Sequence, residues 1–422
     1  MRIWLVLISV LCAIAILPVH AESLLLKDDD FVVQKFVSGI CCSPTTMAFI
    51  GDDILILHKT SGQVSLIRDG VLHGTVLDEN VTFAGEQGML GIATVGNKVY
   101  LYFTESTHDG GSPLGKRVYS YDWNGEKLVN KTLIVDFAQT QTYHNGGDMA
   151  VDLNGTVYLV LGDAGRYGKL QNKPVGEPDD TSVILPIAPP GPYYAVGVRN
   201  SFGLAVDPIT GKLWDTENGD DNFDEINLVE KNFNSGWIAI MGPANETQLA
   251  NLHGYPSYVY QDPKFSWEQV VAPTGLTFIN SESFDKYKNS LFALDCIYGH
   301  LYRFELNENR DGFVFNSPEL SDNVVNMGES MDEIIFGTGF GCATDIVAGP
   351  DGLLYIVSLS DEAIYRILPK TMIDQVVVTD SAHPPYLAYA IIAAIVIISA
   401  IVSIFYLRKR SRISNANISA PS

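Results

Sequence analysis

The segment MAVDLNGTVYLVLGD, residues 149–163, carries the repeating pattern from which we infer the fold class. Two short runs of apolar, aromatic and β-branched residues stand on either side of Asn154-Gly155. An Asn-Gly pair favours the tight turn of a β-hairpin, because both of its residues adopt left-handed backbone conformations readily. The segment therefore predicts two antiparallel strands joined at this turn.

The same pattern recurs along the chain, and we count six copies of it. The other five are MAFIGDDILILH (47–58), IATVGNKVYLYF (92–103), GLAVDPITGKLWDTE (203–217), GLTFINSESFDKYKNSLFALD (275–295) and DIVAGPDGLLYIVSL (345–359). The copies lie 45 to 72 residues apart, measured between Ala48, Ala93, Ala150, Ala205, Thr277 and Val347. Periods of this length with several strands each are typical of propeller blades. We therefore predict an all-β fold, a six-bladed β-propeller, with a pair of β-sandwiches as the alternative.

The two ends of the chain predict a single-pass type I membrane protein. Arg2, the apolar run after it and the small residue Ala21 have the order of a signal peptide. Residues 386–407 carry no charge and can span a bilayer, and four basic residues follow within 408–412. The expected organisation is a signal peptide at 1–21, an extracellular propeller domain at 22–370, a juxtamembrane linker at 371–385, a transmembrane helix at 386–407 and a cytoplasmic tail at 408–422.

The composition excludes one class of partner and fits an extracellular location. The net charge is −22 and the isoelectric point is about 4.6, whereas nucleic-acid binding requires basic patches. Glycosylation sequons occur at Asn80, Asn130, Asn154 and Asn245. We therefore expect no nucleic acid among the partners.

Four segments interrupt the hairpin pattern with glycine and polar residues, and they hold the candidate chemistry. These segments are residues 85–93, 143–166, 197–208 and 216–237. In the second segment His144 precedes two glycines, and Asp163 follows the predicted strand pair. A histidine oriented by a carboxylate is a common general base, and a histidine that only caps a turn is the alternative.

Together these segments resemble the soluble quinoprotein glucose dehydrogenases, also called glucose/sorbosone or aldose sugar dehydrogenases. The shared motifs are H-x-G-G at His144, G-D-x-G at Gly162, G-x-R-N-x-x-G-L-A-x-D-P at Gly197 and D-E-x-N-x-x-x-x-x-x-N-x-G-W at Asp224. The resemblance extends over about residues 32–368. It implies a six-bladed propeller, a sugar substrate and an external electron acceptor.

The resemblance also implies catalytic roles for three residues. His144 matches the base that takes the proton of the sugar C1 hydroxyl as hydride passes to pyrroloquinoline quinone. Asp163 matches the carboxylate that holds this histidine. Arg199 matches the arginine that stabilises negative charge on the quinone oxygen.

Further positions match cofactor and metal contacts in the family. Asn200 and Thr274 match cofactor contacts, and Glu86 stands near the expected sugar, where the family often has glutamine. Gly219 and Asp220 match the positions whose backbone carbonyls bind calcium, and Asp220 replaces the usual proline.

The chain departs from the family where the cofactor's carboxylates would need cations. A lysine and two arginines are replaced by Ile297, Cys342 and Thr344. Two functions therefore stay open: a quinone- and calcium-dependent sugar dehydrogenase, or a cofactor-free cell-surface propeller that binds a ligand or a protein.

Four cysteines remain after the signal peptide, an even number that favours disulfides in an oxidising compartment over metal binding, for which no C-x-x-C spacing or nearby histidine pair is present. Cys41 and Cys42 open the first predicted blade, which is adjacent to the last blade in a closed ring. We therefore predict a disulfide between Cys342 and one of these two cysteines, and a second between Cys296 and the other.

Overall fold

The computed structural model describes residues 24–138, 140–166 and 168–373. The chain divides into two compact units, Met1–Leu368 and Pro369–Ser422, and only residues 369–373 of the second are described. The predicted signal peptide and the predicted span at 386–407 lie outside the described residues. Within the described ranges, no helix combines the length and the apolar character needed to cross a membrane.

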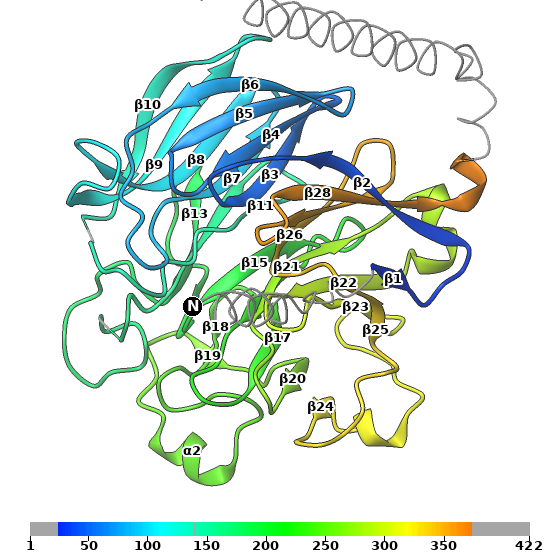
Figure 1. Cartoon of the computed structure of the whole chain (residues 1–422). Helices are drawn as coiled ribbons and strands as arrows, with labels where there is room; N and C mark the ends of the chain where they lie inside the picture. Colours follow the sequence, from blue (N-terminus) through cyan, green and yellow to red (C-terminus); the bar gives the residue numbers. More distant parts are fainter. Residues whose placement is uncertain (1–23, 139, 167, 374–422) are drawn as a thin grey trace, which may run out of the picture. The chain divides into compact units, whose positions relative to one another are not determined.

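The described strands of the first unit form six sheets (Figure 1). The first two sheets contain β3 to β6 (Pro44–Ile50, Asp53–His58, Gln63–Arg68, Val71–Asp78) and β7 to β10 (Met89–Val95, Lys98–Ser106, Pro113–Trp123, Leu128–Asp136). The third contains β11 (Met149–Val151), β12 (Val157–Leu161), β13 (Val183–Ala188), β14 (Ala195–Val196), β18 (Phe233–Asn234) and β19 (Val259–Tyr260).

The other three sheets follow in chain order. The fourth contains β15 (Ser201–Val206), β16 (Leu213–Glu217), β17 (Asp224–Val229), β20 (Phe265–Trp267) and β24 (Val324–Val325). The fifth contains β21 (Pro273–Phe278), β22 (Ser290–Asp295), β23 (Leu301–Glu305), β25 (Ile335–Thr338) and the N-terminal β1 (Leu25–Leu26). The sixth contains β26 (Ala343–Ala348), β27 (Leu354–Ser358), β28 (Ala363–Pro369) and β2 (Phe31–Ser38).

The inner strands of the six sheets contact one another in a closed cycle. The order of these strands is β3, β7, β11, β15, β21, β26 and again β3. Threonine side chains link neighbouring sheets within this cycle. Thr45 donates to the carbonyl of Met89 at 3.0 Å, and Thr274 donates to the carbonyl of Ala343 at 2.7 Å. This ring confirms the predicted all-β propeller and excludes the alternative of two β-sandwiches.

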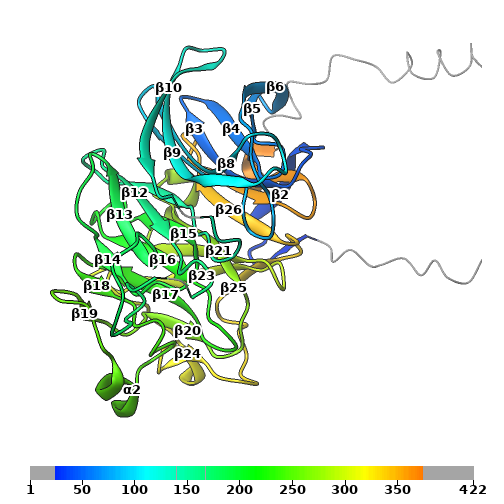
Figure 2. The same cartoon turned by 90° about the vertical axis from the view of Figure 1, so that its left-hand side faces the viewer.

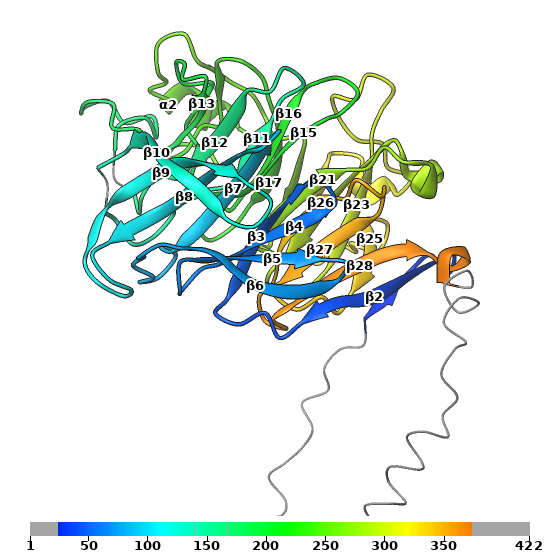
Figure 3. The same ribbon diagram turned by 90° about the horizontal axis from the view of Figure 1, so that it is seen from above.

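Strand β2, the second along the chain, completes the last sheet, because it pairs with β28 at that sheet's outer edge (Figure 3). Residues more than 300 positions apart therefore belong to one sheet, and Arg366 donates to the Gln34 side chain at 2.7 Å. Closure by strands from both ends of the domain ties the ring together through main-chain hydrogen bonds.

Burial is most complete in the middle strands of several sheets and falls at the outer edge. Every residue of β16, β17 and β22 is buried, because neighbouring sheets cover both faces. The outer strands β6 and β10 are largely exposed. Each of the six repeats corresponds to the first two strands of one sheet. Helix α2 (Glu246–Asn251) lies in a loop outside the sheets, between β18 and β19 (Figure 2).

Candidate active site

A cavity of about 310 Å³ opens at the mouth of the ring where the inner strands begin. All six sheets contribute residues from the starts of these strands and from nearby loops. The lining residues are Thr45, Thr46, Lys59, Gly85, Glu86, Leu90, Gly146, Asp148, Phe202, Asn218, Ala272, Thr274, Cys296, Thr344, Asp345 and Leu359. Two of the predicted cofactor residues, Glu86 and Thr274, are therefore cavity residues.

His144 and Asp163 form a close pair beside this cavity. His144 Nδ1 lies 2.6 Å from Asp163 Oδ1, and Trp237 Nε1 donates to Asp163 Oδ2 at 2.7 Å. Burial raises the pKa of Asp163, but hydrogen bonds from His144, the backbone of Arg166 and Trp237 prevail and leave it below its usual value. Asp163 is fully buried, whereas 17% of the His144 side chain is exposed. An ionised carboxylate at Nδ1 leaves His144 Nε2 available to accept a proton.

Glu86 holds the backbone of the histidine loop in place. Its Oε2 accepts hydrogen bonds from the backbone N–H of His144 at 2.7 Å and of Asn145 at 3.3 Å. His144 has a φ of 54°, a left-handed conformation that is uncommon for a residue with a side chain. The Glu86 carboxylate thus fixes a backbone that His144 alone would not favour, and Asn200 Nδ2 lies 3.5 Å from the same oxygen.

Arg199 lies next to the pair and is itself held from two sides. The backbone N–H of Asp163 donates to the carbonyl of Arg199 at 2.8 Å. The backbone N–H of Arg199 donates to Glu217 Oε1 at 2.6 Å, and the Arg199 guanidinium donates to the carbonyl of Asn218 at 2.9 Å. The guanidinium carbon also lies 5.2 Å from the centre of the Trp237 ring. His144, Asp163 and Arg199 therefore converge, as the sequence predicted.

Asp220, one of the two predicted metal residues, directs its carboxylate to arginines. Oδ1 accepts a hydrogen bond from Arg199 at 3.0 Å, and Oδ2 pairs with Arg166. Gly219 donates its N–H to Asp224 Oδ1 at 2.7 Å, which closes the loop between β16 and β17. The aspartate that replaces the family's proline therefore neutralises part of the Arg199 charge.

Several polar atoms around the dyad are buried without a partner among the described residues. They are Arg199 Nε, Asn200 Oδ1 and Asn145 Oδ1. A buried polar atom without a hydrogen bond is costly, by about 1–3 kcal/mol. An ordered water, an ion or a bound molecule commonly supplies the partner of such an atom.

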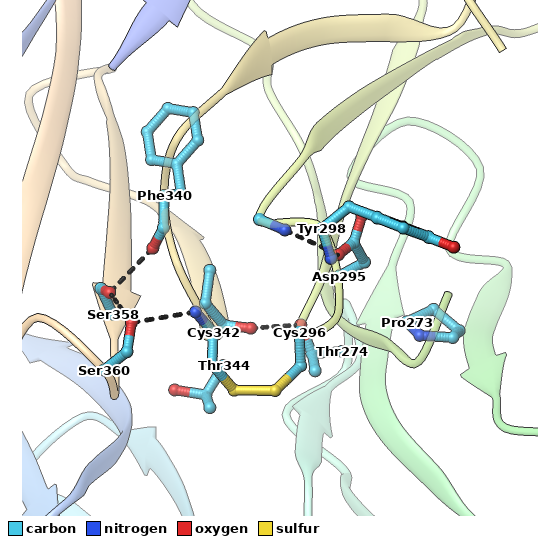
Figure 4. The surroundings of a disulfide bond; sticks show 12 residues. Pro273, Thr274, Asp295, Cys296, Tyr298, Phe340, Cys342, Thr344, Ser358 and Ser360 are labelled. Atoms are coloured by element: carbon cyan, nitrogen blue, oxygen red, sulfur yellow. Dashed lines mark hydrogen bonds between the residues drawn. A yellow bond between two sulfur atoms is a disulfide. The ribbon is translucent and has the colours of Figure 1, made fainter. Parts of the chain in front are cut away.

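The opposite wall of the cavity contains a disulfide between Cys296 and Cys342, whose Cα atoms are 3.8 Å apart (Figure 4). The predicted pairing of Cys342 with Cys41 or Cys42 is wrong, as is the pairing of Cys296 with the other, because both of these cysteines are free thiols. Cys296 directly follows β22 and Cys342 directly precedes β26, and these two strands pack against each other. The packing of these two sheets against each other therefore brings Cys296 and Cys342 together.

The three positions at which the family resemblance leads us to expect cations lie together on this wall. Cys342 is in the disulfide, Thr344 lines the cavity and Ile297 follows Cys296 with 54% of its surface exposed. Thr274 donates to the carbonyl of Ala343, which joins this wall to the neighbouring sheet. Among the lining residues that the structure describes, Lys59 is the one with a positive charge.

Two carboxylates lie deeper in the cavity. Asp148 accepts the backbone N–H of Leu204 at 2.6 Å, and Asp345 accepts that of Met47 at 2.8 Å. Each carboxylate thus joins its own inner strand to that of the next sheet. Burial raises the pKa of Asp345 to about 6, and burial together with repulsion from Asp345 raises that of Asp148 well above its usual range.

Sequence reasoning missed three residues that shape the site. Trp237 stood within a quoted motif, but its hydrogen bond to Asp163 follows only from the packing of the β18 loop. Glu217 lies beneath Arg199, and burial raises its pKa to about 7. Lys116 is buried within β9 near Glu86 and Asp163, and burial lowers its pKa to about 8. Nothing in the sequence distinguished Lys116 from an ordinary strand residue.

Comparison with known proteins places this site in a family. The family model for glucose/sorbosone dehydrogenase matches residues 41–366. Aldose sugar dehydrogenase YliI of Escherichia coli K12 is 27% identical over 307 residues, which cover 67% of this chain and 77% of that protein.

Two solved structures share the fold. A glucose dehydrogenase-type oxidoreductase of Thermus thermophilus has a TM-score of 0.62 and 25% identity, covering 80% of this chain and 100% of that one. The PQQ-bound aldose sugar dehydrogenase of Streptomyces coelicolor has a TM-score of 0.59 and 21% identity, covering 81% and 99%. Since the family model matches well over half of the sequence, the chain belongs to the glucose/sorbosone dehydrogenase family of oxidoreductases.

Proposed function

We propose that this protein oxidises the C1 hydroxyl of a sugar, with pyrroloquinoline quinone as its cofactor and His144 as the general base. The observation that carries this proposal is the His144–Asp163 pair, 2.6 Å apart, beside a cavity that all six sheets line. A base with a fixed tautomer next to a substrate-sized cavity is the arrangement that proton abstraction from a hydroxyl requires.

The protein's own residues would act in a defined order. His144 Nε2 takes the proton from the C1 hydroxyl, while Asp163 stabilises the imidazolium that forms. Trp237 keeps the Asp163 carboxylate in place, and Glu86 keeps the histidine loop in place. Arg199 would stabilise the negative charge that develops on the group that accepts the hydride.

Residues close to the dyad, beside the cavity, offer contacts for pyrroloquinoline quinone. Arg199 Nε and Asn200 Oδ1 are buried without partners, so a ligand with both donors and acceptors would satisfy them. The chemistry supplied by the quinone, when bound, is acceptance of the hydride that leaves C1. Thr274 would contact the cofactor from the next wall, and the backbone carbonyls of Gly219 and Asp220 would bind calcium.

The wall formed by Ile297, Cys342 and Thr344 supplies no cation for the cofactor's carboxylates. Each charge-assisted contact of this kind contributes roughly 1.5–3 kcal/mol. The loss of two such contacts weakens binding by about two or more orders of magnitude. We therefore expect the quinone to bind this chain more weakly than it binds relatives that keep the three cations.

One observation favours the second function, a cofactor-free binding domain for a ligand or a protein partner. Large apolar side chains are exposed on loops at the mouth, with 60% of Tyr143 and 54% of Ile297 accessible. Tyr143 directly precedes His144, and Ile297 directly follows the disulfide cysteine Cys296. An apolar rim around a cavity suits recognition of a partner surface or of the apolar face of a sugar.

A titration distinguishes the two functions. The purified full chain is titrated with pyrroloquinoline quinone at fixed calcium while the quinone absorbance is followed, and dye-linked oxidation of a panel of aldoses is then measured. Saturable binding with sugar-dependent dye reduction supports the dehydrogenase. Absence of binding at high micromolar quinone overturns it and leaves the binding domain.

We further propose that each of the six sheets is one blade and that the propeller lies outside the cell, anchored by residues 386–407. The asparagines of the sequons at 80, 130, 154 and 245 are all exposed, which suits glycosylation in the secretory pathway. Endoglycosidase treatment of the chain from eukaryotic cells should then lower its apparent mass. Protease added to intact cells should remove the propeller, and full protection of the propeller would contradict the proposed orientation.

A further inference from the structure

Cys41, Cys42 and His58 form a cluster that the proposed oxidation does not use. Their potential ligand atoms all lie within 4.8 Å of one another. Cys41 is exposed, Cys42 is partly exposed and His58 is buried, with 2% of its surface accessible. The cluster is therefore anchored on one side and open to solvent on the other.

The backbone brings the two adjacent sulfurs together. In an extended chain, consecutive side chains point to opposite faces. Cys42 and Ser43 instead have φ values of 69° and 58°, which break this alternation immediately before β3. A left-handed conformation at two consecutive residues with side chains costs on the order of 1–3 kcal/mol each, so the surrounding structure must hold it.

The turn between β4 and β5 holds this loop. The backbone N–H of Lys59 donates to the carbonyl of Ser43 at 3.0 Å, and that of Thr60 donates to the carbonyl of Cys42 at 3.3 Å. The Thr60 hydroxyl also donates to the Cys42 carbonyl at 3.1 Å. His58 ends β4 beside this turn, so the same contacts fix the distance between the imidazole and both sulfurs.

The His58 ring is held through both of its nitrogens. Its Nε2 lies 2.8 Å from the Ser65 hydroxyl, and its Nδ1 donates to the Cys41 carbonyl at 2.7 Å, so a metal bound at Nδ1 would take the place of that proton while Ser65 keeps the ring in position. Metal-binding histidines usually place their second ring nitrogen against an oxygen, which fixes the ring and its tautomer.

The donor set selects the kind of ion. Two thiolates and an imidazole suit soft or borderline cations, whereas calcium and magnesium prefer oxygen ligands. Three protein ligands leave one tetrahedral position for water or for an exogenous ligand. We propose that Cys41, Cys42 and His58 bind a thiophilic d¹⁰ cation, Zn²⁺ or Cu⁺, at the mouth of the propeller.

The test uses the full chain, reduced under anaerobic conditions and freed of reductant. Co²⁺ is added as a spectroscopic substitute for Zn²⁺, and sulfur-to-cobalt charge-transfer absorption should saturate at one ion per chain. Competition with a colorimetric zinc chelator and with a Cu⁺-specific chelator then shows which ion binds more tightly. Both ions should compete for the same site.

Variants locate the site on these residues. Cys41→Ser and Cys42→Ser alter exposed or half-exposed side chains, so they should fold and should each weaken binding at least tenfold. His58→Gln should do the same, and loss of its fold is recognised by its melting temperature. His73→Gln, an exposed histidine on β6 of the same sheet, is the matched control and should bind like the wild type.

Three results would overturn the proposal. The first is the absence of stoichiometric, sulfur-derived cobalt absorption in the reduced wild type. The second is unchanged affinity in both cysteine variants. The third is a Cys41–Cys42 peptide that stays 2 Da lighter after reduction by mass spectrometry, because a disulfide between adjacent cysteines would exclude the metal.

Discussion

His144 performs its proposed role only through contacts made by other residues. Asp163 fixes its Nδ1, and Glu86 fixes its left-handed backbone. Neither contact involves Nε2, the nitrogen that would meet the substrate. Removal of the imidazole should therefore affect the chemical step far more than the binding of the cofactor.

We predict that His144→Ala lowers dye-linked sugar oxidation by at least a factor of 100, because general-base catalysis contributes about 10²–10⁴-fold. Quinone affinity should change less than threefold, since Arg199 and Asn200 remain. Steady-state kinetics and the absorbance titration measure the two effects separately. His253→Ala, an exposed histidine far along the chain, serves as the control. Equal activity of the two variants would show that His144 is not the base.

At the scale of secondary-structure elements, the wall between β22 and β26 holds the positions at which the sequence departs from the motifs expected for the family. A disulfide closes it, and Ile297 and Thr344 stand where the family resemblance leads us to expect cations. This wall would therefore influence the stability of the ring and, under the proposed function, the affinity for an anionic cofactor.

We predict that replacing Cys296 and Cys342 together by alanine destabilises the propeller by about 2–4 kcal/mol. The cysteines are 46 residues apart, and a cross-link over such a loop restricts the unfolded chain. Chemical denaturation of the wild type and the double variant, both without reductant, measures the difference. Treatment of the wild type with reductant should reproduce the effect. An unchanged unfolding midpoint would mean that the bond contributes nothing to stability.

We also predict that Ile297→Lys combined with Thr344→Arg tightens quinone binding by about two orders of magnitude. Two restored charge-assisted contacts supply roughly 1.5–3 kcal/mol each, and Ile297 is exposed enough to accept a lysine. The absorbance titration measures the change. Ile297→Met with Thr344→Gln is the neutral control of similar size. If both double variants bind equally, the charge deficit does not limit affinity.

At the scale of the whole molecule, buried carboxylates join the inner strands. Asp345 connects β26 to β3 and so closes the ring, while burial raises its pKa from 3.8 to about 6. Glu217 supports Arg199 and its pKa is raised from 4.5 to about 7, also by burial. Both groups hold a proton in the folded state at pH values where the unfolded chain has lost it.

We predict that the stability of the propeller falls as the pH rises from about 4 to 7. A raised carboxyl pKa means that the folded state binds more protons than the unfolded chain in this interval. The free energy of unfolding therefore decreases as the pH rises. The Asp345 contribution should develop between pH 4 and 6 and amount to at most about 3 kcal/mol. Asp345→Asn keeps a hydrogen-bond acceptor for Met47 but removes the charge. The melting temperature of this variant should exceed that of the wild type at pH 7.5 and match it at pH 4. If the two proteins melt at the same temperature at both pH values, the pKa of Asp345 is not raised.

The fold could be predicted from the sequence because its signal is local. A turn such as Asn154-Gly155 and the alternation around it lie within fifteen residues, and six such hairpins at blade-like spacing indicate a ring. The outer strands carried little signal, because exposed strands such as β6 need no apolar pattern. The pairing of β2 with β28 was also invisible, since its partners are over 300 residues apart.

The sequence by itself determined the hairpins, the family and the residues of the dyad, because each depends on a short motif. Only the tertiary structure decided which distant groups meet. It placed Cys296 rather than Cys41 or Cys42 against Cys342, brought Trp237 to Asp163 and directed Asp220 to Arg199. It also gathered Cys41, Cys42 and His58 into one cluster. These contacts depend on how the sheets pack around a closed ring, and no local pattern encodes that geometry.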